Sequence, residues 1–335
     1  MPKNSLHQNA LTIDSHNDSI VAHIRRNISF AGSDRPAGHS GTVRYLRDHI
    51  ASSEVQLNFP KMKQGGLDAA FFAVDVTRAW HNHLAYAMDA LGFFHQEVKA
   101  HPDVIQIARC ADDIVDAKND GRLAAILAIE NSEGIDRSLN TLHSLYEVGV
   151  RSIGITHNLN TWASTGNAEE HRNAGLTNFG TDLVKEMNEL GIIVDVSHIS
   201  ERGFYDVLDT ATRPIIASHS NCRALWDHPR NLRDDQIKAL AQNGGVIGVT
   251  FVRDFVDDHE PTFEKLIHHI DHIIQLAGPD HAGIGSDFDG GGDLISDATH
   301  LPSITEALQE RGHSDEVIKK VLGENYFRVF QSACG

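Results

Sequence analysis

Eight apolar runs with the length and composition of β-strands recur along the chain, and helical patterns separate them. The runs cover residues 10–15, 67–76, 124–131, 151–157, 192–198, 214–220, 245–251 and 282–287. Their continuous apolar character is typical of parallel strands that are buried on both faces and covered by helices. Eight such units in 335 residues predict an α/β fold, a (β/α)8 barrel of the TIM type, as a single catalytic domain over residues 1–335.

Helices are expected between these strands over residues 84–100, 138–148, 181–190, 200–208, 234–242, 263–276 and 303–309. Serines at 138 and 200 are suitable N-caps, and Gly191 is a suitable C-cap. The connection over residues 27–66 is long for the link between a strand and the next one in such a barrel. We expect it to form an elaborated lid or wall over the mouth of the barrel.

The composition excludes several classes of partner. A net charge of −17 argues against nucleic acid and anionic membranes. The chain contains no run of eighteen apolar residues, so no membrane span is expected. Its three cysteines are few and irregularly spaced, and the N-terminus lacks a basic-then-apolar signal pattern. These features predict a cytoplasmic protein.

Polar residues with the chemistry of metal ligands stand at the ends of several expected strands. His16 and Asp18 are two residues apart, and therefore lie on one face of an extended strand. Glu130, His198 and His219 end other apolar runs. Taken alone, each histidine is consistent with an ordinary buried histidine, and Glu130 is consistent with a salt bridge. Because the C-terminal strand ends of a barrel meet at one face, the whole set instead favours two divalent metals that share a carboxylate.

Three further residues have the chemistry of an amide hydrolase. Asp287 is placed to carry a proton, and it is preferred over Asp289 because it is closer to the end of the eighth run. His157 ends the fourth run and is suited to stabilise a developing oxyanion, or else it is a capping or core histidine. Arg230 is either a surface charge or a bidentate ligand for a substrate carboxylate.

These motifs together resemble those of the membrane dipeptidase (renal dipeptidase) family of zinc peptidases, in the amidohydrolase superfamily. The resemblance covers nearly the whole chain. The matching stretches are His16-Asn17-Asp18, Phe59-Pro60 through Gly65-Gly66, Ile129-Glu130-Asn131, Thr156-His157-Asn158, Asp195-Val196-Ser197-His198, Ser218-His219-Ser220, Pro229-Arg230-Asn231, Gly285-Ser286-Asp287-Phe288-Asp289-Gly290 and the terminal Glu324-Asn325-Tyr326-Phe327-Arg328-Val329-Phe330.

The resemblance implies two Zn²⁺ ions per chain, held by His16, Asp18, Glu130, His198 and His219. The first two residues would bind one ion, the last two the other, and the glutamate would bridge them. The resemblance further implies that Asp287 is the general acid and base, that His157 polarises the scissile carbonyl, and that Arg230 holds the substrate's C-terminal carboxylate. It predicts a dipeptide substrate, frequent tolerance of a D-residue at the C-terminal position, and a homodimer.

One position departs from the family pattern. Many members carry a tyrosine where this chain has Asp75, after a buried apolar stretch. A carboxylate there needs a partner. That partner is either the nearby Arg78 or a cation on the substrate, and we expect the substrate cation: its α-amino group or a basic N-terminal side chain.

Rival functions remain open at this stage. An N-acyl-amino-acid deacylase would use the same metals on another amide that carries a carboxylate, so Arg230 fits both activities. A barrel that keeps metals for structure alone is disfavoured by Asp287 and His157. Single-metal deaminases usually carry His-x-His on the first strand, so Asp18 in place of the second histidine argues against that class. Amidohydrolases bridged by a carbamylated lysine need a lysine at a strand end, and here Glu130 would bridge instead.

Overall fold

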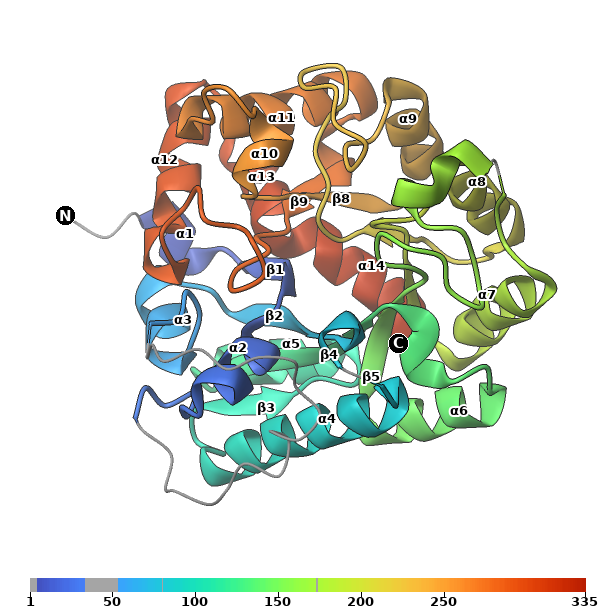
Figure 1. Ribbon diagram of the computed structural model, residues 1–335. Helices are drawn as coiled ribbons and strands as arrows, with labels where there is room; N and C mark the ends of the chain where they lie inside the picture. Colours follow the sequence, from blue (N-terminus) through green and yellow to red (C-terminus); the bar gives the residue numbers. More distant parts are fainter. Residues whose placement is uncertain (1–4, 34–53, 80, 173) are drawn as a thin grey trace.

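The structure is a computed structural model that describes residues 5–33, 54–79, 81–172 and 174–335. It is a barrel of parallel strands surrounded by helices (Figure 1). The strands are β1 (Ile13–Asn17), β2 (Ala69–Asp75), β3 (Ile105–Ile107), β4 (Leu123–Glu130), β5 (Val150–Gly154), β6 (Ile193–Asp195), β7 (Ile216–Ala217), β8 (Val246–Val249) and β9 (Ala282–Ile284). The order β2-β1-β9-β8-β7-β6-β5-β4 closes on itself, because β2 also pairs with β4. All eight predicted strands are therefore present, and the predicted TIM-type barrel is confirmed.

The helices of the described residues cover the outside and one end of the barrel (Figure 1). They are α1 (Ser5–Asn9), α2 (Ser19–Arg26), α3 (Phe59–Gly65), α4 (His83–Ala100), α5 (Ala111–Asn119), α6 (Leu139–Val148), α7 (Asn178–Leu190), α8 (Glu201–Thr210), α9 (Asp234–Gln242), α10 (Arg253–Val256), α11 (Phe263–Ala277), α12 (Pro302–Glu310), α13 (Asp315–Lys319) and α14 (Asn325–Cys334), with a π-helical turn at Lys320–Glu324. In these residues no helix is both long and apolar enough to cross a membrane.

Strand β3 and several helices, among them α2 and α5, were not predicted. β3 pairs with the first residues of β4, where Ile105 lies opposite Leu123 and Ile107 opposite Ala125. β2 pairs with one edge of β4 along its length, so β3 and β5 both pair with the opposite edge. β3 pairs with residues 123–125 of β4, and β5 pairs with residues 127–129. β3 is therefore a short ninth strand beside the eight that close the barrel.

The two faces of each strand bury side chains in different places. Phe71 and Ile126 point into the barrel and form one apolar cluster with Tyr326 of α14. Their neighbours in sequence, such as Phe72, belong to the larger cluster beneath the surrounding helices. This alternation follows from the two-residue period of a strand. α14 thus closes the N-terminal end of the barrel, and the C-terminal strand ends are left for the site.

Four strands end three residues earlier than predicted. β5 ends at Gly154, β6 at Asp195, β7 at Ala217 and β9 at Ile284, so residues predicted to end strands lie in the turns that follow. His198 and Asp287 have φ angles of 69° and 58°. That left-handed conformation is incompatible with an extended strand, which explains why β6 and β9 end early.

The predicted elaborated connection over residues 27–66 is described only in part, since residues 34–53 lie outside the described residues. Its last part, before α3, is fastened to the turn after β9, where the amide N–H of Gln56 donates to Oδ1 of Asp289 at 2.8 Å. This contact places residues 54–58 beside the mouth of the barrel. The role of the whole connection as a lid or wall stays a prediction.

Candidate active site

A cavity of about 220 Å³ opens at the C-terminal face of the barrel. It is lined by most of the residues that the sequence singled out: Asp18, Asp75, Glu130, His157, His198, His219 and Asp287. These seven side chains come from the ends of seven different strands. His16 lies against them, with Nε2 3.9 Å from an oxygen of Glu130 and 3.9 Å from an oxygen of Asp287. Barrel topology has therefore brought together residues that are far apart in the chain.

Glu130 lies between two groups of histidines. Its Oε1 is 3.0 Å from Nε2 of His198 and 3.6 Å from Nε2 of His219. Its Oε2 faces the other way, toward Nε2 of His16. A carboxylate in this position can offer a different oxygen to each of two neighbouring cations.

The group of His16, Asp18 and Glu130 has the geometry of a metal site, because one ligand atom from each lies within 4.8 Å of the others. Nε2 of His16 and Oδ1 of Asp18 are buried and have no hydrogen-bond partner among the described residues. Leaving such atoms unpaired costs about 1–3 kcal/mol each. Coordination of a cation would satisfy both atoms at once.

The second group is formed by His198, His219 and Glu130. The two imidazole Nε2 atoms are 2.7 Å apart. Nδ1 of His198 lies 2.8 Å from Oδ1 of Asn158, an acceptor, so the hydrogen-bond network assigns the proton to Nδ1 and the lone pair to Nε2. Burial lowers the pKa of both histidines well below its usual value, which keeps the rings neutral. Neutral imidazoles are the form that binds metal.

The carboxylates of the site favour a bound cation. Burial, together with the charges of Asp75 and Asp287, raises the pKa of Asp18 well above its usual value. Burial and the charge of Asp18 do the same for the pKa of Glu130. A divalent cation would stabilise the charged forms of both groups. Histidine nitrogens with carboxylate oxygens are also the donor set that zinc accepts, so these residues fit a metal centre.

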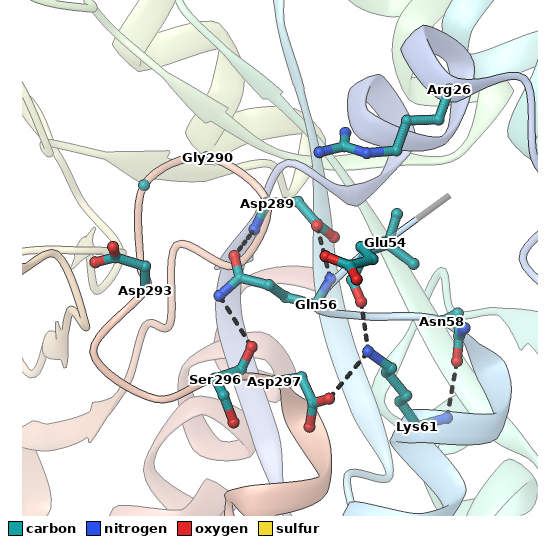
Figure 2. A pocket seen from close by; sticks show the side chains of 12 residues that line it. Arg26, Glu54, Gln56, Asn58, Lys61, Asp289, Gly290, Asp293, Ser296 and Asp297 are labelled. Atoms are coloured by element: carbon teal, nitrogen blue, oxygen red, sulfur yellow. Dashed lines mark hydrogen bonds and ion pairs between the residues drawn. The ribbon is translucent and has the colours of Figure 1, made fainter. Parts of the chain in front are cut away.

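The two aspartates after β9 have different surroundings. Asp287 faces the cavity, and burial raises the pKa of its carboxyl group to about 7. Asp289 faces a larger neighbouring cavity of about 820 Å³, where it is bonded to the main chain of Gln56 (Figure 2). Its Oδ2 also accepts from Oγ of Ser19 at 2.7 Å. Asp289 therefore holds loops together, and Asp287 is the one that reaches the ligand groups.

His157 and Arg230 flank the histidine pair. The ring of His157 stacks on that of His198 at 4.2 Å and its side chain is 28% exposed, so it can meet a substrate. Arg230 is buried, which makes the interpretation as a surface charge wrong. Its Nη2 donates to the carbonyl of His219 at 3.0 Å and its guanidinium lies over the Phe255 ring. Its Nε has no hydrogen-bond partner in the part of the chain that the structure describes. It lines a smaller cavity beside the first, together with His198.

Asp75 has the structural partner that the sequence offered as an alternative. Its Oδ2 is 3.0 Å from Nε of Arg78, and its Oδ1 accepts from the amide N–H of Thr77 at 2.8 Å. Asp75 also pairs with Glu130 in the register of β2 and β4, so its carboxylate lies beside the metal ligands. Arg78 is exposed over 41% of its side chain.

Sequence reasoning missed residues that hold the site in place. Asn158 and Asp195 stand inside the motifs of the predicted site residues His157 and His198, but nothing in the sequence shows which atoms they contact. Gly290 is the third such residue. A Cβ atom there would lie 2.2 Å from an oxygen of Asp18 and 2.2 Å from an oxygen of Asp287, so only glycine lets the two carboxylates approach each other this closely.

Comparisons with known proteins point to one family. The family model described as "Membrane dipeptidase (Peptidase family M19)" matches residues 2–334. The chain is 36% identical to "Dipeptidase verJ" of Clonostachys rogersoniana over 265 residues, which are 78% of this chain and 68% of that protein. It is 32% identical over 352 residues to an uncharacterised dipeptidase of Schizosaccharomyces pombe, covering 97% of this chain and 80% of that protein.

Solved structures agree with this result. A crystal structure of a dipeptidase described as a metallopeptidase of family M19 is 27% identical, with a TM-score of 0.83, and covers 97% of this chain and 99% of that one. A metallopeptidase from Rhodobacter sphaeroides, liganded with a phosphinate mimic of the dipeptide L-Ala-D-Ala, is 26% identical, with a TM-score of 0.82 and the same coverage. The resemblance inferred from the motifs is therefore confirmed: the chain belongs to the membrane dipeptidase family, peptidase family M19, and is a metallo-dipeptidase.

Proposed function

We propose that this chain hydrolyses dipeptides with two zinc ions and accepts a D-residue at the C-terminal position. The observation that carries the proposal is the place of Glu130, whose two oxygens face His198 with His219 on one side and His16 on the other. Five ligands are too many for a single catalytic zinc that keeps a position open. Shared by two ions, they leave room for water and substrate.

The metal ligands divide into two sets. His16 and Asp18 would hold one ion, His198 and His219 would hold the other, and Glu130 would belong to both sets. When bound, the zinc pair would polarise the scissile carbonyl and lower the pKa of a water molecule.

Two residues of the chain move or hold protons during the reaction. Asp287 accepts the proton of the attacking water and delivers it to the nitrogen of the leaving amine. His157 donates a hydrogen bond to the carbonyl oxygen as negative charge develops there. Both line the cavity with the ligands, which supports these roles.

Arg230 binds the carboxylate at the C-terminus of the dipeptide. Its buried guanidinium lies next to the histidine pair, and its Nε–H has no hydrogen-bond partner within residues 5–33, 54–79, 81–172 and 174–335. A charge-assisted pair with a carboxylate suits this group. Tolerance of a D-residue is supported by the ligand of the Rhodobacter sphaeroides relative, a mimic of L-Ala-D-Ala. A homodimer stays a prediction of the family resemblance.

The experiment is a panel of alanine dipeptides with all four combinations of chirality, together with N-acetyl-L-alanine, assayed with zinc. The proposal predicts that L-Ala-L-Ala and L-Ala-D-Ala are cleaved and that N-acetyl-L-alanine is not. Cleavage of the acetylated substrate in place of the dipeptides would identify an N-acyl-amino-acid deacylase. Loss of all cleavage when the C-terminal residue is D would contradict the stereochemical part.

A further inference from the structure

We propose that Asp195, acting through Ser218, is a positioning residue that fixes the metal-binding tautomer of His219. The proposal rests on the proposed function, since it concerns one of the zinc ligands. Asp195 ends β6 and Ser218 follows β7, so the two residues join the tips of neighbouring strands. Both are buried.

A chain of hydrogen bonds runs from the aspartate to the histidine ring. Oγ of Ser218 lies 2.5 Å from Oδ2 of Asp195 and 2.8 Å from Nδ1 of His219. Oδ1 of Asp195 accepts from the amide N–H groups of Ser218 and Ser197, each at 3.0 Å. The aspartate is therefore held from both strands.

The direction of these bonds follows from the chemistry of the groups. An ionised carboxylate only accepts, so the Ser218 hydroxyl donates its hydrogen to Asp195. The hydroxyl oxygen is then an acceptor for His219, and the histidine proton lies on Nδ1. Nε2 of His219 is left with its lone pair, 3.6 Å from Oε1 of Glu130. A ligating histidine is commonly oriented by a bond from its other nitrogen, and here that bond passes through a serine.

Asp195 is close enough to His16 and His219 to be considered as a metal ligand itself. Its hydrogen bonds argue against that role. Both of its oxygens already accept hydrogens from the strand tips, whereas Asp18 offers a buried oxygen to which no described residue donates. Asp195 orients a ligand, and Asp18 has an oxygen to give to a metal.

The chain contains a matched control. Asp14 of β1 accepts from the amide N–H of Ser286 at 2.7 Å and from its hydroxyl at 2.8 Å. The same pair of hydrogen bonds, from an amide and a hydroxyl, joins Ser218 to Asp195. Asp14 is also buried. The difference is that, among the described residues, the Ser286 hydroxyl contacts no histidine ring: it lies 3.1 Å from the carbonyl oxygen of His16 and accepts from the amide N–H of Phe288 at 3.1 Å.

The test compares Asp195→Asn with Asp14→Asn. Asparagine keeps an acceptor for the two amide N–H groups but presents an NH₂ group to Ser218. The serine hydroxyl must then turn toward Nδ1 of His219 as a donor, which moves the histidine proton to Nε2. We expect Asp195→Asn to lower zinc affinity roughly 10- to 100-fold, as loss of a ligand-orienting group does. Asp14→Asn should leave the affinity within about 2-fold of wild type, because its serine orients no ring.

Zinc affinity is measured by competition with a chelator, and the tautomer by ¹⁵N NMR of histidine in the metal-free protein. The signal of His219 is identified among the 22 histidines by its loss in His219→Gln. In wild type and Asp14→Asn it should report protonated Nδ1, and in Asp195→Asn protonated Nε2. If Asp195→Asn fails to fold, Ser218→Ala against Ser286→Ala repeats the comparison, and only the first should lose affinity.

Equal affinities in Asp195→Asn and wild type, equal losses in the Asp195 and Asp14 variants, or an unchanged His219 tautomer would each overturn the proposal. A wild-type protein that binds zinc but cleaves no dipeptide would instead contradict the proposed function. The two failures are therefore distinguishable.

Discussion

Oε1 of Glu130 lies 3.0 Å from Nε2 of His198, although one residue ends β4 and the other lies in the turn after β6. The second oxygen of the same carboxylate faces the histidine of β1. One side chain thus connects two groups of ligands that come from different sides of the barrel. Removing it should have consequences at both.

Glu130→Gln should weaken both zinc sites, because an amide has no negative charge and only one oxygen to offer. His198→Ala should weaken mainly one site, since His198 belongs to a single ligand set. Zinc per chain after dialysis against a weak chelator, measured by elemental analysis, checks this. Retention of one full equivalent by Glu130→Gln would show that the carboxylate does not bridge.

Asp287→Asn should keep its zinc and lower turnover by about 10²- to 10⁴-fold, the usual value of general acid–base catalysis. The asparagine is close in size, but it cannot accept the proton of water. The comparison is Asp289→Asn, which should lower thermal stability through loss of its loop contacts and affect turnover less. Near wild-type turnover in zinc-loaded Asp287→Asn would mean that another group carries the proton.

Arg230→Ala should lower kcat/KM for a dipeptide by about 10- to 100-fold, because a hydrogen bond to a charged group contributes roughly 1.5–3 kcal/mol. Amidating the C-terminus of the dipeptide should cost the wild type a similar factor and the variant little more. Steady-state kinetics of the four combinations form a double-mutant cycle. Additive losses would show that Arg230 does not contact the carboxylate.

Asp75→Asn should reduce activity selectively on dipeptides that begin with Lys or Arg, if Asp75 recognises a basic N-terminal side chain. Equal losses on substrates that begin with Lys, Ala and Glu would point to recognition of the α-amino group. Activity that is unchanged on all three would leave Asp75 as the structural partner of Arg78, to which it is bonded. The measurement is kcat/KM for each substrate.

The fold and the gathering of the candidate metal ligands could be predicted because both depend on local patterns and one topological rule. Continuous apolar runs gave the strands, and the meeting of strand ends at one face brought His16, Glu130 and His198 together. β3 was not predicted because a three-residue strand with half-buried residues leaves no apolar run in the sequence. It was found only through its pairing with β4.

The supporting contacts could not be predicted, because they depend on register and on backbone angles. Predicting the hydrogen bond between Asp195 and Ser218 requires knowing which residues of β6 and β7 lie opposite each other. The preference for Asp287 over Asp289 rested on its closeness to the end of the predicted strand, whereas in the structure the turn after β9 decides which cavity each aspartate lines. Both aspartates have left-handed φ angles, and the turn sends their side chains to separate cavities.

The most direct test of the binuclear account is a zinc titration of the metal-free protein, with hydrolysis of L-Ala-D-Ala followed at each addition. The account predicts that activity rises until two equivalents of zinc per chain are bound and then stays constant. Full activity at one equivalent, or no hydrolysis at any zinc loading, would contradict it.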